Sequence, residues 1–260
     1  MSLVLLENTG PIAKLILNNP DNLNAMTEAM GEAIHARVEE INSRPDLRVV
    51  ILTGSGRAFS AGGDLDFILG RTQKSWEVNQ REMVEFYSRF LCLREIKVPT
   101  IAMIQGHAIG AGFLIALACD LRYASEGAKM AVNFAKLGLS SGMGGLYSLV
   151  RLAGPAHAAD LLLTGRTIEG NTALQMGLIN ELLPAESLEA RVFSVAEQIA
   201  ANAPVALRIM KRGLQATAYG DLKQVMQFES EGQAETFGTE DLQEGIRAIR
   251  EKRPPKFTGR

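Results

Sequence analysis

Residues 100–117 have the sequence TIAMIQGHAIGAGFLIAL, in which a strand, a tight turn and a helix follow one another directly. The apolar run at residues 100–104 is typical of a buried strand. A glycine-rich turn follows at residues 106–112, and residues 113–118 continue as a helix that is apolar on every side. A helix without a polar face must be buried, so this segment predicts the centre of a hydrophobic core.

A second glycine-rich segment, AFSAGGDL at residues 58–65, also follows a strand-like run. Small residues let the backbone approach a ligand closely, and the start of a helix presents N–H groups without a helical partner. If the two turns face each other, two N–H groups can bind one oxygen. Such an oxyanion hole suits a thioester carbonyl that becomes an enolate. The alternative interpretation is two tight strand-to-helix turns without a ligand.

Strands and helices alternate along the first part of the chain, and helices alone follow. The pattern predicts strands over residues 4–6, 12–17, 49–52, 100–104, 121–124 and 130–132. It predicts helices over residues 27–43, 75–95, 113–118, 147–152, 155–163, 171–177, 186–202, 204–218, 221–235 and 241–252. Residues 54–64 are expected to form a loop. This alternation favours parallel pairing through crossover helices, and therefore an α/β fold.

The composition is ordinary for a globular protein, with 47% hydrophobic residues, 22% charged residues and a formal net charge of −2 in 260 residues. The charge gives no support for a nucleic-acid surface, and no apolar run reaches the ~18 residues of a membrane helix. No secretory signal pattern is visible. Cys92 and Cys119 are expected to be buried free thiols of a reducing compartment. We therefore expect a cytoplasmic protein that binds neither nucleic acid nor a membrane.

Several common site motifs do not occur in the sequence. The segment from Gly54 to Gly56 lacks the later glycines of a dinucleotide fingerprint, and no Gly-Lys-Ser/Thr ending marks a P-loop. The Gly-x-Ser-x-Gly pattern of a hydrolase nucleophile is absent. No His/Cys cluster has metal-ligand spacing, so no metal is expected.

Further short segments match the crotonase (enoyl-CoA hydratase/isomerase) superfamily in order and spacing. They are residues 22–26, 50–54, 58–65, 99–120, 136–139, 163–166, 173–180 and 244–257. The chain resembles this superfamily over nearly its whole length. The resemblance implies the β-β-α superhelix of the ClpP/crotonase fold over residues 1–195. It also implies a C-terminal helical segment over residues 196–260 that builds homotrimers, often paired into hexamers.

The resemblance further implies an acyl-CoA substrate, with coenzyme A as part of the substrate and no permanently bound cofactor. The oxyanion donors would be the N–H groups of Gly63 and Ala111. Ala111 stands where many relatives have glycine, a change that leaves the N–H in place. The residues implied to bind the substrate are Asn24, Ala25, Ala61, Gly62, Gly110, Leu114, Phe134, Lys256 and Phe257. The last two match a segment that often contacts the nucleotide end of coenzyme A from a neighbouring subunit.

The sequence departs from the family pattern at the acid–base positions. Hydratases of the family carry glutamates where this chain has Leu114 and Phe134. Hydration needs carboxylates to activate water and to protonate the α-carbon, and neither side chain can transfer a proton. Gly142 stands where other branches have an aspartate, and Ser141 stands where one decarboxylase branch has a tyrosine. Ser141 is therefore the remaining candidate for a catalytic side chain.

Apolar residues beside an oxyanion hole favour enolate chemistry that needs little acid–base work. Decarboxylation of a malonyl-type thioester is such a reaction, because loss of carbon dioxide leaves an enolate without any base. Asn133, Ser140 and Ser141 could orient the carboxylate or a water molecule. The alternative for Ser141 is a loop hydroxyl that bonds to the backbone.

Two other functions remain open at this point. One is an enoyl-CoA hydratase with relocated acid–base groups, for which Asp66, Glu77 and Glu82 on the expected lid are candidates. The other is a non-catalytic acyl-CoA-binding protein. Asp64 is expected to cap the helix after the first turn, and His107 to be tied to the backbone.

Overall fold

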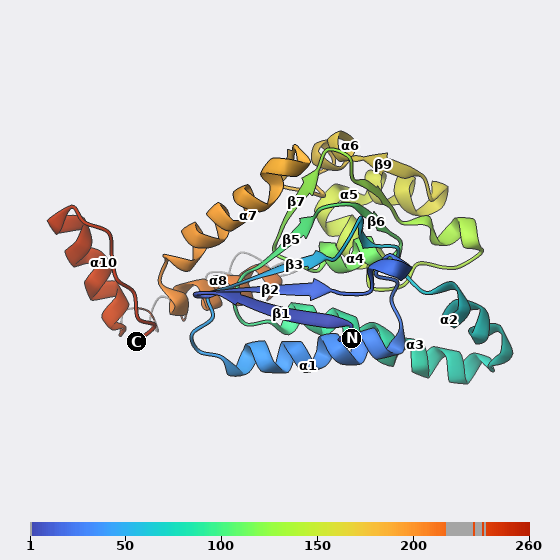
Figure 1. Cartoon of the computed structure of the whole chain (residues 1–260), viewed down its shortest axis with the longest axis horizontal. Coiled ribbons are helices and arrows are strands. Elements are labelled where there is room, and N and C mark those ends of the chain that lie inside the picture. Colours follow the sequence, from blue (N-terminus) through green and yellow to red (C-terminus); the bar gives the residue numbers. More distant parts are fainter. Residues whose placement is uncertain (1, 217–230, 232–235, 237) are drawn as a thin grey trace.

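The computed structural model describes residues 2–216, 231, 236 and 238–260 (Figure 1). The helix expected over residues 221–235 lies outside the described residues, apart from residue 231. Two β-sheets with helices on both sides form the body of the molecule, and helices end the chain. The predicted α/β class is confirmed.

The larger sheet has six strands in the order β1-β2-β3-β5-β7-β10. They are β1 (Val4–Thr9), β2 (Ile12–Leu17), β3 (Val49–Gly54), β5 (Thr100–Ile104), β7 (Leu121–Ser125) and β10 (Glu181–Leu183). β1 and β2 form an antiparallel hairpin, and the other neighbours pair in parallel. In β3, Val50 and Leu52 face one hydrophobic cluster while Val49 and Ile51 face the other. Alternate side chains point to opposite faces, so a strand buried on both faces must be apolar throughout.

The smaller sheet has four strands in the order β4-β6-β8-β9. They are β4 (Ala58–Ser60), β6 (His107–Ile109), β8 (Lys129–Ala131) and β9 (Thr167–Glu169). β4 lies inside the expected loop over residues 54–64, and β6 lies inside the expected turn over residues 106–112. Both predictions are therefore wrong over these strands. Neither β9 nor β10 was expected. Each of these strands has only three residues, too few for a periodic pattern, and they form because distant segments pair with one another.

Helices cover both faces of the larger sheet (Figure 1). α1 (Glu28–Ser43), α3 (Trp76–Leu91) and α4 (Ala111–Leu117) contribute to the hydrophobic cluster on one face. α7 (Ala185–Ala200) covers the other face, where Leu188 and Val192 pack against the strands. Thr27 caps α1, because its hydroxyl accepts a hydrogen bond from the Met30 N–H at 3.2 Å.

The remaining elements connect the sheets and end the chain. They are the helices α2 (Leu65–Gly70), α5 (Gly145–Thr164), α6 (Gly170–Gln175), α8 (Pro204–Ala216) and α10 (Glu240–Glu251), and the short 3₁₀ helices η1 (Pro20–Asn22), η2 (Arg71–Gln73), η3 (Cys92–Glu95) and η4 (Asn133–Leu137). α5 contains both helices expected over residues 147–152 and 155–163, separated by a kink at Gly154. The helix expected over residues 75–95 is α3 followed by η3, and α2 is the helix that Asp64 was expected to cap.

A buried ion pair fastens α8 to the body. The Lys211 side chain is 6% exposed, and its Nζ lies 2.9 Å from the carboxylate of Asp120. It also donates to the carbonyl of Val98 at 2.8 Å. The division expected between residues 195 and 196 falls within α7, and α8 begins at Pro204; the division into two domains stays a prediction.

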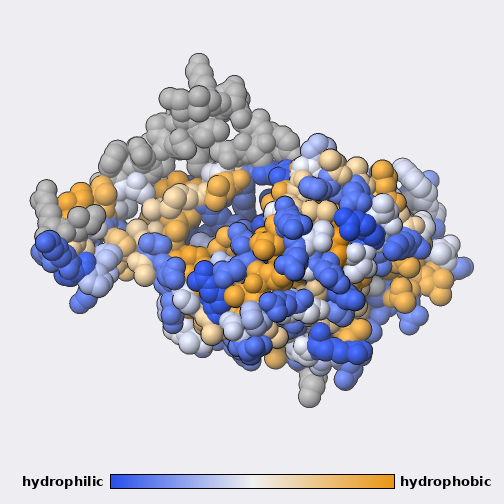
Figure 2. All heavy atoms as spheres, turned by 90° about the horizontal axis from the view of Figure 1, so that it is seen from above, coloured by the Kyte–Doolittle hydropathy of each residue, from blue (hydrophilic) through white to orange (hydrophobic). Residues whose placement is uncertain are grey.

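α10 lies on an arm that projects from the body (Figures 1 and 2). The tail that follows α10 returns toward the body, where Gly259 lies beside Pro204 and Arg48. Among the described residues, no helix is long and apolar enough to cross a membrane.

Candidate active site

The two glycine-rich turns meet at the end of paired strands. β4 and β6 are parallel, with Ser60 opposite Ala108, so the residues that follow both strands lie side by side. A side chain at Gly62 would collide with the other turn, because its Cβ would lie 2.5 Å from the carbonyl oxygen of Ile109. Gly62 also has φ 90°, which favours glycine. The close approach of the turns therefore requires glycine at this position.

Two backbone N–H groups at these turns have no partner. Gly63 and Ala111 line the same cavity, and among the described residues neither N–H donates a hydrogen bond. Ala111 is the first residue of α4, after Gly110 with φ 54°, so its N–H has no acceptor within the helix. The bridge between Gly63 and Met26 uses the N–H groups of Met26 and Asp64 instead. Two neighbouring free donors can bind one anionic oxygen.

The cavity in front of these donors has a volume of about 890 Å³. Residues of the two turns, of α2 and α3, and of the segment from η4 to the start of α5 form its wall. Its apolar lining includes Leu65, Phe67, Ile68, Met83, Phe86, Phe134, Leu137, Leu139 and Met143. A largely apolar cavity with a few polar groups suits a ligand that has a hydrophobic part and one polar centre.

Many of the predicted site residues meet in this cavity. Ala25, Ala61, Gly63, Gly110, Ala111 and Phe134 all line it. Asn133 and Ser140, which the sequence suggested as orienting groups, line it as well. The roles of these residues stay predictions, but the structure brings them to one place.

The Asn24 side chain is hydrogen-bonded to backbone groups next to the cavity. This side chain is fully buried. Its Nδ2 donates to the carbonyl oxygens of Ser55 and Ala58, each at 2.9 Å, and its Oδ1 accepts from the Asn19 N–H at 2.8 Å. The side chain therefore fixes the segment that leads into β4, and with it the position of the first turn.

Leu114 and Ser141 lie in the packed region next to the cavity. Leu114 is 0% exposed, and Ser141 Oγ is buried with no hydrogen-bond partner among the described residues. Both pack against Gly145, where an added Cβ would lie 2.5 Å from Ser141 Oγ and 2.9 Å from Leu114 Cδ1. As placed, neither side chain belongs to the cavity wall.

α3 contributes wall residues that the sequence analysis did not assign to the site. Asn79, Met83, Phe86 and Tyr87 line the cavity, and their spacing places them on one face of the helix. Helical periodicity was the available signal, but it does not distinguish a face that lines a cavity from one that lies in the core. Tyr87 is half-buried, and burial raises the pKa of its phenol.

Asp64 is occupied as a helix cap, as predicted. Its Oδ1 accepts from the Phe67 N–H at 3.0 Å, and its Oδ2 accepts from Asn22 Nδ2 at 3.1 Å. These hydrogen bonds, first that from Phe67, lower the pKa of Asp64. An ionised carboxylate that is held in this way is a poor proton donor at neutral pH.

Ion pairs join the lid formed by α2 and η2 to α1 and α3. Arg71 pairs with Glu82 on α3 and, at 3.1 Å, with Glu28 on α1. Its guanidinium also lies 4.4 Å from the centre of the Phe67 ring. Lys74 adds a second cation at 2.6 Å from Glu82. The hydrogen bonds from Lys74 and Arg71 lower the pKa of Glu82, which does not line the cavity.

Other reactive groups are buried or occupied. Cys92 and Cys119 are free and buried, and burial raises the pKa of each thiol to about 12, so neither is an activated nucleophile. His107 Nδ1 accepts from the Lys129 N–H at 3.1 Å, which confirms that it is tied to the backbone. Within the part of the chain that the structure describes, no three His, Cys, Asp or Glu side chains are placed to hold a metal ion.

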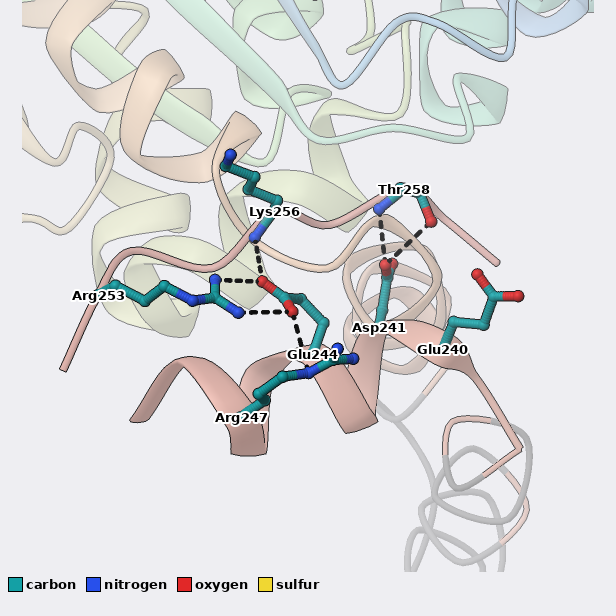
Figure 3. A pocket seen from close by; sticks show the side chains of 7 residues that line it. All are labelled: Glu240, Asp241, Glu244, Arg247, Arg253, Lys256 and Thr258. Carbon is teal, nitrogen blue, oxygen red and sulfur yellow. Dashed lines mark hydrogen bonds and ion pairs between the residues drawn. The ribbon is translucent and has the colours of Figure 1, made fainter. Parts of the chain in front are cut away.

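A smaller cavity of about 340 Å³ lies on the C-terminal arm (Figure 3). Glu244 accepts from the Arg253 guanidinium at 2.6 and 3.0 Å and from the Lys256 N–H at 2.9 Å. These hydrogen bonds lower the pKa of Glu244 to about 2. The Lys256 side chain points away from the cluster, and Phe257 packs beside Gly245. Within one chain, Lys256 and Phe257 therefore belong to the arm and not to the larger cavity.

Comparison with known proteins gives consistent matches over the whole chain. The family model for enoyl-CoA hydratase/isomerase matches residues 7–260. The chain is 33% identical over 255 residues to the short-chain-enoyl-CoA hydratase of Clostridium acetobutylicum, covering 96% of this chain and 95% of that protein. It is 31% identical over 256 residues to the crotonyl-CoA hydratase of Syntrophomonas wolfei, covering 98% and 97%.

The fold of the chain also matches that of solved structures. The crystal structure of the enoyl-CoA hydratase from Bacillus anthracis superposes with a TM-score of 0.93 at 32% identity, covering 99% of this chain and 100% of that one. The sequence matches and this superposition agree with each other from end to end. The chain therefore belongs to the enoyl-CoA hydratase/isomerase family of the crotonase superfamily and has the crotonase fold.

Proposed function

We propose that this protein binds an acyl-CoA thioester in the larger cavity and stabilises its enolate at the N–H groups of Gly63 and Ala111. The observation that carries this proposal is the pair of unpartnered N–H groups in the wall of a mostly apolar cavity. Donors that are fixed in advance in a site of low polarity stabilise charge that develops on a thioester oxygen. Membership of the family supports an acyl-CoA as the class of substrate.

The reaction we favour is enolate chemistry other than hydration by two glutamates, and decarboxylation of a malonyl-type thioester comes first. Leu114 is packed in the core and Phe134 lines the cavity, and neither can move a proton. Loss of carbon dioxide forms the enolate without a base. Asn133 lines the cavity beside Gly110, where its Oδ1 lies 3.2 Å from the position of an added Cβ. We propose that the Nδ2 end of this amide donates to the carboxylate.

The second candidate is an enoyl-CoA hydratase with relocated acid–base groups. The names of the relatives favour it. Asp66 is the lid carboxylate that supports it, since Asp66 lines the cavity and is exposed. Glu82 lies outside the cavity wall in its ion pairs, and Glu77 is also absent from the wall. Replacement of Asp66 with Asn should abolish crotonyl-CoA hydration if this candidate is correct.

We also propose how the protein assembles and where it is located. Coenzyme A would enter as part of the substrate, and no resident cofactor is proposed. Leu163 and Leu214 are 81% and 72% exposed, and such side chains support burial between subunits of a homotrimer or hexamer. In such an assembly Lys256 and Phe257 would close the coenzyme A site of a neighbour. We place the protein in the cytoplasm and propose no nucleic-acid or membrane partner.

The test is a mass-spectrometric screen of the purified protein against crotonyl-, malonyl-, methylmalonyl-, 3-enoyl- and aromatic acyl-CoA. Gly63→Pro removes one oxyanion donor and should lower turnover about 10²–10³-fold. Gly63→Ala is the matched control. It keeps the N–H, and its Cβ meets only the flexible end of Ile68 at 3.1 Å.

Each outcome of this screen selects one function. Loss of carbon dioxide or a double-bond shift that fails in Gly63→Pro and survives in Gly63→Ala supports the proposed enolate chemistry. Hydration of crotonyl-CoA with kcat in the usual range of about 1–10³ s⁻¹ selects the hydratase instead. Binding of a thioester without any product selects a non-catalytic acyl-CoA-binding protein.

A further inference from the structure

The hydroxyl of Tyr87 is a free polar group in the wall of the larger cavity. Tyr87 lies on the face of α3 that also presents Met83 and Phe86 to the cavity. It is half-buried. Among the described residues its hydroxyl makes no hydrogen bond, and Asn79 Oδ1 on the same helix face and Ser141 Oγ are also without a partner. A phenol in an apolar wall usually has a polar partner, and the ligand of the cavity can provide one.

The ionic groups near Tyr87 do not supply a proton to the apolar part of the cavity. Asp64 is held by the Phe67 N–H and by Asn22. The Arg71 guanidinium is engaged by Glu28 and Glu82. Asp66 also lines the cavity, but it is exposed to solvent. Tyr87 therefore offers a proton to the apolar part of the cavity, where Phe134 offers none.

Gly142 makes room for the Tyr87 ring. An added Cβ at Gly142 would lie 2.6 Å from Tyr87 Oη and 2.9 Å from its Cζ. The φ of Gly142 is not among the positive values of this chain, so the backbone conformation itself does not require glycine. The phenol thus occupies the space that a side chain at residue 142 would need. Its hydroxyl rests against the segment that leads to Met143, which also lines the cavity.

The ionisation of Tyr87 suits an acid. Burial raises the pKa of the phenol above its ordinary value of 10.0. The phenol therefore carries its proton throughout the neutral range and can donate it to a strongly basic carbanion. A general base at this position would need a phenol whose pKa is lowered toward neutral pH.

We propose that Tyr87 is a catalytic general acid that protonates the α-carbon of the enolate formed in this cavity. The proposal rests on the enolate chemistry of the preceding section. In decarboxylation, the bond between the α-carbon and the carboxylate breaks, carbon dioxide leaves, and the electron pair forms the enolate. The Tyr87 O–H bond then breaks as the new C–H bond forms and the thioester carbonyl returns. The phenolate regains its proton from water at the cavity mouth.

The experiment follows the delivery of the proton directly. The full-length protein decarboxylates methylmalonyl-CoA in D₂O, and NMR of a chiral derivative gives the configuration of deuterium at C2 of the propionyl product. The wild type should give one configuration. Tyr87→Phe should give a racemic product, because water then protonates the enolate from both faces. Release of carbon dioxide should fall by less than about tenfold, because the acid acts on the later step.

Two further variants test whether the position of the Tyr87 hydroxyl, and not the loss of any buried phenol, decides the configuration of the product. Gly142→Ala keeps the phenol but displaces its hydroxyl, and it should also give a racemic product. Tyr123→Phe removes a phenol from the core beneath α7 and should keep the wild-type configuration. Carbon dioxide release with wild-type configuration in Tyr87→Phe overturns the role of Tyr87 and leaves the proposed function in place. A wild type that releases no carbon dioxide overturns the decarboxylation and the role of Tyr87 together, while the screen of the other thioesters still tests the enolate chemistry.

Discussion

At the level of one residue, Leu114 stands where the sequence comparison with the family predicts a glutamate in hydratases. It is 0% exposed and packs against Gly145 beside Ser141. A leucine there contributes about 1.5–3 kcal/mol of burial free energy and carries no proton. Ser141 lies in the same packed region with an unpartnered hydroxyl. The proposed reaction would therefore use groups from other elements, among which Asn133 and Tyr87 line the cavity.

Replacement of Leu114 with Glu should destabilise the fold. The carboxyl would be buried without a cation, at a cost of about 3 kcal/mol at pH 7. Its folded pKa would be raised, so the loss should be small below the unfolded value of about 4.3 and should grow as pH rises. Urea unfolding at pH 4 and pH 7 measures this difference. Leu114→Met is the control of similar volume and should cost less than about 1.5 kcal/mol. Equal stability of the Glu variant and wild type at pH 7 would contradict this burial.

At the level of elements, ion pairs and the stacking of Phe67 on Phe86 connect the lid to the body. α2 has no buried residue, and Leu65 and Leu69 are 68% and 66% exposed. Arg71 connects this segment to Glu28 on α1 and to Glu82 on α3. Exposed ion pairs are weak singly and are screened by salt. The lid should therefore respond to pH and ionic strength while the sheets do not.

Glu82→Gln should loosen the lid in a pH-dependent way. The pKa of Glu82 is lowered from 4.5 by the hydrogen bonds from Lys74 and Arg71. Its contribution is present above 4.5 and is lost as pH falls through the lower folded pKa. Urea unfolding should thus show a difference between wild type and Glu82→Gln at pH 7 that shrinks toward pH 3 and in 1 M salt. Glu85→Gln, an exposed change on the same helix, should have no effect at either pH. A Glu82→Gln difference that persists at pH 3 would refute the ionic origin.

At the level of the whole molecule, the C-terminal arm is fastened by its own contacts. Asp241 accepts from the N–H groups of Thr258 and Gly259 at 2.6 and 2.8 Å, and Glu244 holds Arg253 and the Lys256 N–H (Figure 3). The tail also reaches the body at its end, where Gly259 lies beside Pro204 and Arg48. These carboxylates decide the position of the last residues.

Glu244→Gln should release the tail. The pKa of Glu244 is lowered from 4.5 to about 2, first by the hydrogen bond from Arg253. The wild-type contact is therefore complete above pH 4.5 and is lost as pH falls toward 2. Trypsin at neutral pH should cleave after Lys252 or Lys256 faster in Glu244→Gln than in wild type. Glu251→Gln is the control, because Glu251 contacts the Arg253 Nε alone. Equal cleavage rates in all three proteins would show that other contacts hold the tail.

The sequence by itself determined the α/β class, the central strands and the two turns. The strand from Val49 to Leu52 is apolar on both faces, and the helix after Gly110 has no polar face, so each has one stable environment. The family pattern added the crotonase fold and pointed to Gly63 and Ala111. Local composition and order are sufficient for such features, because each follows from burial or from backbone freedom within a few residues.

Only the tertiary structure decided which side chains meet in the cavity. The three-residue strands β4 and β6 exist because they pair with each other, and this pairing brings the two turns together. Asn24 proved to hold the backbone, while α3 supplied Tyr87 from a face that a periodic pattern would assign to the core. Contacts between distant segments depend on the packing of the whole chain, and no local pattern specifies them.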